Sequence, residues 1–191
     1  ISGRYEFKNK GIDVFIDAMG QLNRNNGLGK EVLAFILVPA GHAGANKELL
    51  HNLELPYQAV TSTDLYLTHY LNDSANDPVM NRIRAQKLRN SEEDKVKIFF
   101  VPSYLNGDDG VFNMPYYDLL VGMDLTAFPS YYEPWGYTPL ESLAFKVPTI
   151  TTTLAGFGLW VKEHYNMNHP GIEVIHREDG DASNVATAIA E

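Results

Sequence analysis

The chain has 191 residues, a formal net charge of −9 and no cysteine, and 45% of its residues are apolar. This composition is typical of a globular protein long enough to bury a core; no run approaches the roughly 20 apolar residues of a membrane span, and we expect no membrane association. The acidic charge argues against nucleic acid as a partner, and the lack of cysteine excludes disulfides, thiolate metal sites and a cysteine nucleophile.

The first part of the chain predicts a β-α-β unit. Residues 1–3 resemble the end of a strand, and residues 32–38 form an apolar run typical of a parallel strand covered on both faces. Between them, apolar residues at helical spacing predict a helix over 12–23. They are Ile12, Phe15, Ile16, Met19 and Leu22. The chain begins without Met inside a strand pattern and stops inside a helical pattern, so we expect an excised domain.

The remaining elements alternate between helix and strand. Residues 39–44 predict a loop, residues 45–53 a weak helix, and the polar region up to residue 77 has no clean period. Further helices are expected over 78–89, 115–122, 138–146, 158–165 and from 183 onwards. Further strands are expected over 97–101, 124–128, 148–151 and 172–176. This alternation predicts an α/β fold with a doubly wound parallel sheet and right-handed crossovers.

The turn between the strand ending at Phe128 and the next helix predicts an anion site. Thr138 can cap this helix, Pro139 suits its first position, and Glu141 follows Thr138 at the spacing of a capping box. The amides of Gly136, Tyr137 and Thr138 would then point out of a helix N-terminus beyond the carboxyl end of a strand. Parallel α/β sheets bind phosphate at such places.

Two cations follow the first strand. Arg4 and Lys10 lie between its carboxyl end and the first helix, at the ligand edge of a doubly wound sheet. There they could grip a diphosphate and neutralise the charge that develops on it as a bond breaks. On position alone, two solvated loop cations are the favoured interpretation.

Three stretches carry a family resemblance. They are G-R-Y-E-F-K-N-K-G at residue 3, Y-Y-E-P-W-G-Y-T-P at residue 131 and T-I-T-T-T-L-A-G-F-G at residue 149, with Glu133 and Glu141 eight positions apart. In these stretches the chain resembles retaining glycosyltransferases of GT-B architecture, and most closely the fungal and animal glycogen synthases (glycosyltransferase family 3).

The resemblance implies a Rossmann-like C-terminal half of a GT-B fold. Residues 1–191 would form a single nucleotide-sugar-binding domain, with the acceptor-side N-terminal domain absent. The implied reaction moves glucose from UDP-glucose to the non-reducing end of an α-1,4-glucan, with retention and without a metal or other cofactor. The isolated chain is expected to be inactive. The full-length parent would be cytoplasmic, reach its glucan acceptor through the missing domain and could form a homo-oligomer.

The resemblance also assigns catalytic roles. Arg4 and Lys10 would hold the diphosphate, and Glu133 would contact hydroxyls of the donor sugar near the anomeric carbon. The amides of Gly136, Tyr137 and Thr138 would line the phosphate site.

Two further residues that the resemblance assigns to binding of the sugar nucleotide can also be explained by structural roles. Glu141 would bind the ribose hydroxyls, although a capping role explains a glutamate at this spacing equally well. Tyr116 would stack on the uracil base, whereas a lone tyrosine on a short helix is more often half-buried packing. Trp135 is more simply explained by packing than by a role in the pocket.

Other interpretations remain open or are discounted. Asp108 and Asp109 lie between glycines and are better explained by turn conformation than by metal binding. The six histidines show no metal-ligand spacing. A GT-B enzyme with another nucleotide-sugar donor, and a non-catalytic nucleotide-sugar-binding domain, are the alternative functions.

Overall fold

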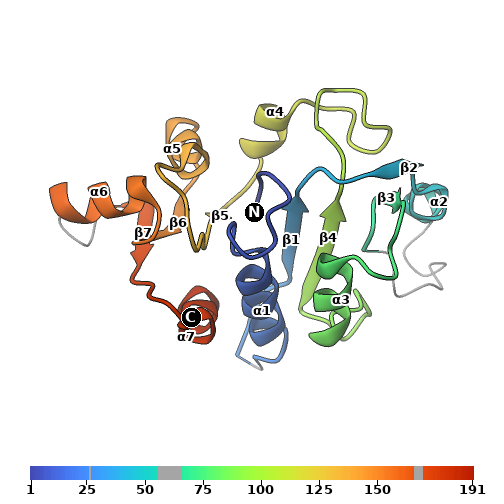
Figure 1. Ribbon diagram of the computed structural model, residues 1–191. Helices are drawn as coiled ribbons and strands as arrows, with labels where there is room; N and C mark the ends of the chain where they lie inside the picture. Colours follow the sequence, from blue (N-terminus) through green and yellow to red (C-terminus); the bar gives the residue numbers. More distant parts are fainter. Residues whose placement is uncertain (26, 56–65, 166–169) are drawn as a thin grey trace.

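The computed structural model describes residues 1–25, 27–55, 66–165 and 170–191, in which helices and strands alternate (Figure 1). Residues 56–65, part of the region without a clean period, lie outside this description. The helices are α1 (Ile12–Asn23), α2 (Lys47–Glu54), α3 (Pro78–Ala85), α4 (Tyr116–Leu120), α5 (Tyr137–Ala144), α6 (Gly156–His164) and α7 (Ala182–Ala190). The strands are β1 (Val32–Leu37), β2 (His42–Ala45), β3 (His69–Leu71), β4 (Val96–Val101), β5 (Thr126–Ala127), β6 (Thr149–Thr152) and β7 (Ile172–Ile175).

The main strands pair in parallel, as the continuous apolar runs predict. β1 pairs with β4, and β6 lies between β5 and β7, all in parallel register. β2 and β3 instead form a short antiparallel pair. β2 includes His42 to Gly44, which the sequence predicts to be loop; that prediction is wrong, because His42 pairs with Leu71.

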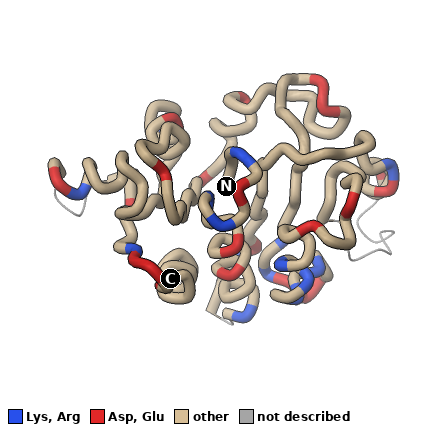
Figure 2. Tube along the Cα trace, viewed as in Figure 1, with Lys and Arg blue, Asp and Glu red and all other residues tan. Residues whose placement is uncertain are grey.

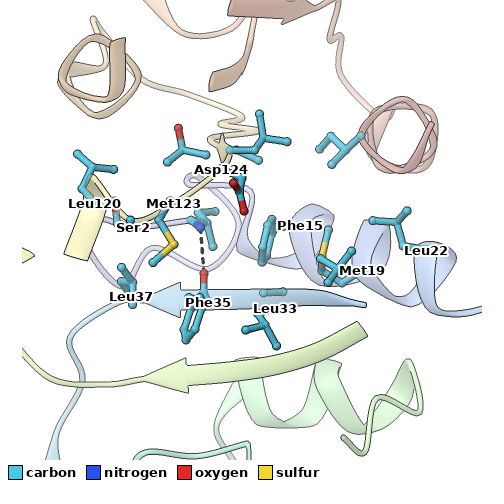
Figure 3. Close-up of a pocket in the computed structure, with 18 of the residues that line it drawn as sticks. Ser2, Phe15, Met19, Leu22, Leu33, Phe35, Leu37, Leu120, Met123 and Asp124 are labelled. Atoms are coloured by element: carbon cyan, nitrogen blue, oxygen red, sulfur yellow. Dashed lines mark hydrogen bonds between the residues drawn. The ribbon is translucent and has the colours of Figure 1, made fainter. Parts of the chain in front are cut away.

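The expected single sheet is interrupted among the described residues. β1 and β4 form one parallel sheet and β5 to β7 another, and a cavity of about 560 Å³ lies between β1 and β5. Figure 3 shows Phe15 and Met19 of α1 and Leu33 and Phe35 of β1 around this cavity. Mostly apolar side chains line it, so it differs in chemistry from the predicted phosphate site.

The first residues of the chain mark the point where the strand order reverses. Ser2 forms a parallel bridge with Leu37, on the edge of β1 away from β4, and thus lies on the side of β1 that faces β5. In Figure 1, β1 and β4 lie on one side of the N-terminus and β5 to β7 on the other. In open α/β sheets, ligands bind beyond the carboxyl ends of the strands at such a reversal.

Helices α1 and α7 connect the two parallel sheets. α1 packs against α7, α3 and β4, and its apolar face is buried in the main core cluster. Val185 and Ala186 of α7 belong to the same cluster, which is continuous with the β1 and β4 side chains. No described helix is long and apolar enough to cross a membrane.

Candidate active site

Lys10 and Glu133 meet at the strand-order reversal. The Lys10 Nζ forms an ion pair with the Glu133 Oε2, although the residues are 123 positions apart in sequence. Their side chains are only 14% and 17% exposed. Each charge is therefore largely removed from water and compensated by the other.

Backbone contacts bring these two residues together. The Tyr131 amide donates to the Asn9 carbonyl at 2.8 Å, which docks the loop after β5 onto the loop before α1. Gly11 adopts a left-handed conformation with φ of 66°, and a Cβ atom there would lie 1.8 Å from the Pro129 carbonyl oxygen. Only glycine permits this close approach, so the residue after Lys10 is pressed against the loop that carries Glu133.

The same region holds the N-terminus of α5, at a different residue from the predicted one. The helix begins at Tyr137 after Gly136, which has φ of 96°, and no side chain caps it. The prediction that Thr138 caps the helix is therefore wrong, and so is the capping box with Glu141. A left-handed glycine reaches the required backbone conformation without a side-chain cap.

The amides at this helix end are available to a ligand. Among the described residues, the N–H groups of Gly136, Tyr137 and Thr138 donate no hydrogen bond. Unpaired amides at a helix N-terminus carry partial positive charge and favour phosphate.

The start of α6 supports the loop between Glu133 and α5. The Gly156 amide donates to the Glu133 carbonyl at 3.0 Å, and the Phe157 amide donates to the Trp135 carbonyl at 2.6 Å. A Cβ atom on Gly156 would lie 2.2 Å from the Pro134 carbonyl oxygen. Trp135 packs edge-on against Phe157, consistent with the predicted packing role.

Glu141 and Tyr116 lie near this helix in separate contacts. Glu141 accepts a hydrogen bond of 3.2 Å from the Tyr117 hydroxyl, and its charge raises the pKa of Tyr117. The Tyr116 hydroxyl lies 2.7 Å from the Ser2 Oγ, and burial raises the pKa of Tyr116. Tyr116 is thus half-buried and held at the end of the first strand.

The structure does not bring Arg4 to the ion pair. Its side chain is 77% exposed and contacts Glu6 at 3.1 Å. Figure 2 shows basic positions in the loop beside the N-terminus, at the centre of the molecule. Arg4 therefore lies in the same loop as Lys10, as predicted, but its side chain takes no part in the Lys10–Glu133 ion pair.

Asp109 of the 106–110 turn has a structural role. The Asp109 carboxylate accepts hydrogen bonds from the amides of Val111, Phe112 and Asn113 at 2.8 to 3.0 Å. This confirms the interpretation by turn conformation for Asp109. Among the described residues, no group of three or more His, Asp or Glu side chains is placed to hold a metal ion.

Comparison with known proteins identifies the family. The sequence model of the glycogen synthase family matches residues 1–65 and 59–191, which together span the chain. This chain belongs to the glycogen synthase family. The resemblance found in the site motifs is thereby confirmed over the whole sequence.

Members of the glycogen synthase family from fungi and animals are about 30% identical to the chain. Glycogen [starch] synthase isoform 2 of Saccharomyces cerevisiae is 32% identical, with 93% of this chain and 34% of the yeast protein covered. The Neurospora crassa glycogen [starch] synthase is 32% identical, with 92% and 33% covered. The rat liver glycogen [starch] synthase is 30% identical, with 86% and 30% covered. The chain thus spans about a third of the length of these relatives.

Two residues near the site were missed in the sequence. Tyr117 contacts Glu141, but the motif M-P-Y-Y offers two adjacent tyrosines and no local reason to prefer either. Arg177 is buried and its Nη1 donates to the Pro129 carbonyl. It follows β7, so the same signal that indicated Arg4 and Lys10, a cation at the carboxyl end of a strand, could have found it.

Proposed function

We propose that this chain is the donor-binding half of a retaining glucosyltransferase, which moves glucose from UDP-glucose to the non-reducing end of an α-1,4-glucan in glycogen synthesis. The observation that carries the proposal is the largely buried Lys10–Glu133 pair at the strand-order reversal, beside the free amides of α5. Membership of the glycogen synthase family supports the reaction class. The acceptor would be held by a further GT-B domain, without which this chain is inactive.

The assigned roles follow from charge. The diphosphate accumulates negative charge as the bond to glucose breaks, and Lys10 and the amides of Gly136 to Thr138 stabilise that charge. Arg4, at the exposed rim, turns inward to the diphosphate. No metal is needed for this neutralisation, because the cations and the helix N-terminus supply it.

Glu133 acts on the sugar. Its carboxylate accepts hydrogen bonds from glucose hydroxyls and stabilises positive charge near the anomeric carbon. Without donor, Lys10 compensates the Glu133 charge; with donor, the diphosphate competes for Lys10. When Lys10 binds the diphosphate instead of Glu133, the Glu133 carboxylate is left to face the sugar.

Tyr116 and Glu141 bind the nucleoside. The Tyr116 ring stacks on uracil, and Glu141 accepts hydrogen bonds from the ribose hydroxyls. Tyr117 orients Glu141 through its hydroxyl.

Turnover and calorimetry of the full-length protein test the proposal. Lys10→Ala and Glu133→Ala are expected to lower kcat at least about 100-fold, because each removes a charge aimed at the transition state. Lys47→Ala, which removes an exposed lysine of α2, serves as the control and is expected to retain wild-type turnover. Unchanged turnover in both site variants, with the protein folded, would refute the assigned roles.

Ligand titration separates the alternatives. UDP and UDP-glucose are expected to bind more tightly than ADP. Preference for ADP would indicate another donor and overturn the uracil contact at Tyr116. Binding of UDP without any transfer would indicate a non-catalytic nucleotide-sugar-binding domain.

A further inference from the structure

Arg177 occupies an unusual environment for a charged residue. It is only 5% exposed, and burial lowers its pKa. Its Nε has no hydrogen-bond partner among the described residues, and the Asp13 Oδ1 is likewise buried without one. Burying a guanidinium with an unsatisfied donor costs stability, so Arg177 is a candidate for a role other than stability.

The contacts of Arg177 converge on the loop that carries Glu133. The Arg177 Nη1 donates to the Pro129 carbonyl, and the guanidinium carbon lies 5.4 Å from the centre of the Tyr131 ring. The Tyr131 hydroxyl in turn donates to the Asp179 carboxylate at 2.6 Å, which raises the pKa of Tyr131. Two residues of the segment after β7, Arg177 and Asp179, therefore contact Pro129 and Tyr131 of this loop.

The same two residues make the contacts to the Lys10 loop. The Pro129 carbonyl is the group pressed against Gly11, and the Tyr131 amide is the donor to Asn9. A cation that donates to the Pro129 carbonyl oxygen restrains the direction of that carbonyl. It thereby restrains the distance between the two loops.

We propose that Arg177 is a positioning residue that holds the Pro129–Tyr131 segment against the Lys10 loop, so that Glu133 meets Lys10. This inference rests on the proposed function for its consequence in catalysis, but the positioning itself can be measured without activity. Arg177 does not act on the substrate directly.

Hydrogen exchange of the full-length protein measures the positioning. Arg177→Met removes the donor and the charge with little loss of volume, and is expected to speed exchange of the Tyr131 amide at least about 10-fold. Arg82→Met is the control for the same chemical change, because Arg82 is an arginine of α3 that binds the Asp17 carboxylate and makes no contact with the Pro129–Tyr131 segment. Its Tyr131 amide is expected to exchange at the wild-type rate. Unchanged protection in Arg177→Met would overturn the proposal, whether or not the protein transfers glucose.

Steady-state kinetics measure the consequence. Arg177→Met is expected to lower kcat at least about 10-fold, since small misplacements of catalytic groups have large effects on rate. Its affinity for UDP should change less than about threefold, because α6 holds the start of α5 independently. Arg177→Lys, which retains a donor for Pro129, should recover most of the lost kcat.

The kinetic outcomes distinguish a failure of the positioning role of Arg177 from a failure of the proposed transferase function. Equal losses of kcat in Arg82→Met and Arg177→Met would mean general destabilisation and would overturn the positioning role. A wild-type protein without transferase activity would contradict the proposed function alone, and the exchange rates would still decide the role of Arg177.

Discussion

At the scale of single residues, the close approach of two backbone segments, at Gly11 and Pro129, determines the geometry of the site. Lys10 and Glu133 share a largely buried ion pair, and Gly11, the residue after Lys10, lets Pro129 of the opposite loop come into close contact. The site therefore depends on a residue without a side chain as much as on its charged groups.

Gly11→Ala is expected to lower the free energy of unfolding by at least about 2 kcal/mol, because it forces an alanine into a left-handed conformation and against the Pro129 carbonyl. Urea denaturation measures the change. Gly29→Ala is the control, because Gly29 has open space around its Cβ position. Equal stability of the two variants would contradict the close contact.

At the scale of elements, α3 and α5 differ in how their N-termini are capped. The Asp77 carboxylate accepts a hydrogen bond of 2.9 Å from the Met80 amide and caps α3, with Pro78 at the first position. α5 begins at Tyr137, after the left-handed Gly136, with no side-chain cap. The α3 start follows ordinary capping chemistry, while the first amides of α5 have no acceptor among the described residues.

Replacing Asp77 and Thr138 in turn tests which of them caps its helix. Asp77→Ala is expected to lower the free energy of unfolding by about 1 to 2 kcal/mol, because it removes the cap of α3. Thr138→Ala is expected to change it by less than about 0.5 kcal/mol, since Thr138 caps nothing. Thermal or urea unfolding measures both, and a loss in Thr138→Ala as large as in Asp77→Ala would restore the capping interpretation.

At the scale of the whole molecule, the two parallel sheets depend on helices to stay together. A cavity lies between β1 and β5, with residues of α1 and α7 in its lining. α7 packs on α1, and the two helices lie side by side in Figure 1. Val185 of α7 is fully buried in the shared core. The relative placement of the Lys10 and Glu133 loops thus relies on this helix pair as well.

Val185→Ala is expected to lower the free energy of unfolding by about 1.5 to 2.5 kcal/mol, because it removes two buried methyl groups and leaves a void. Val121→Ala makes the same chemical change at a residue that is 57% exposed, and should cost less than about 0.5 kcal/mol. Urea unfolding followed by circular dichroism compares them. Similar losses in both variants would argue against α7 as the bridge between the sheets.

The sequence alone was sufficient for features that depend on neighbouring residues. The spacing of apolar residues predicted α1 within its observed bounds, and continuous apolar runs predicted parallel strands. The motifs around Glu133 predicted the family, and the turn before α5 predicted a helix N-terminus with free amides. These signals are local because helix and strand periods, turns and short motifs span only a few residues.

Only the tertiary structure decided which distant residues meet. Lys10 could contact Glu133, and Arg177 could reach Pro129, only through the packing of segments 123 and 48 positions apart. Gly136, with φ of 96°, occupies the N-cap position of α5 in place of the predicted Thr138, and the loop before the helix is held by amides of α6. Arg4 stays at the rim although it shares a loop with Lys10. Such outcomes depend on close packing and backbone geometry between elements, which no local pattern encodes.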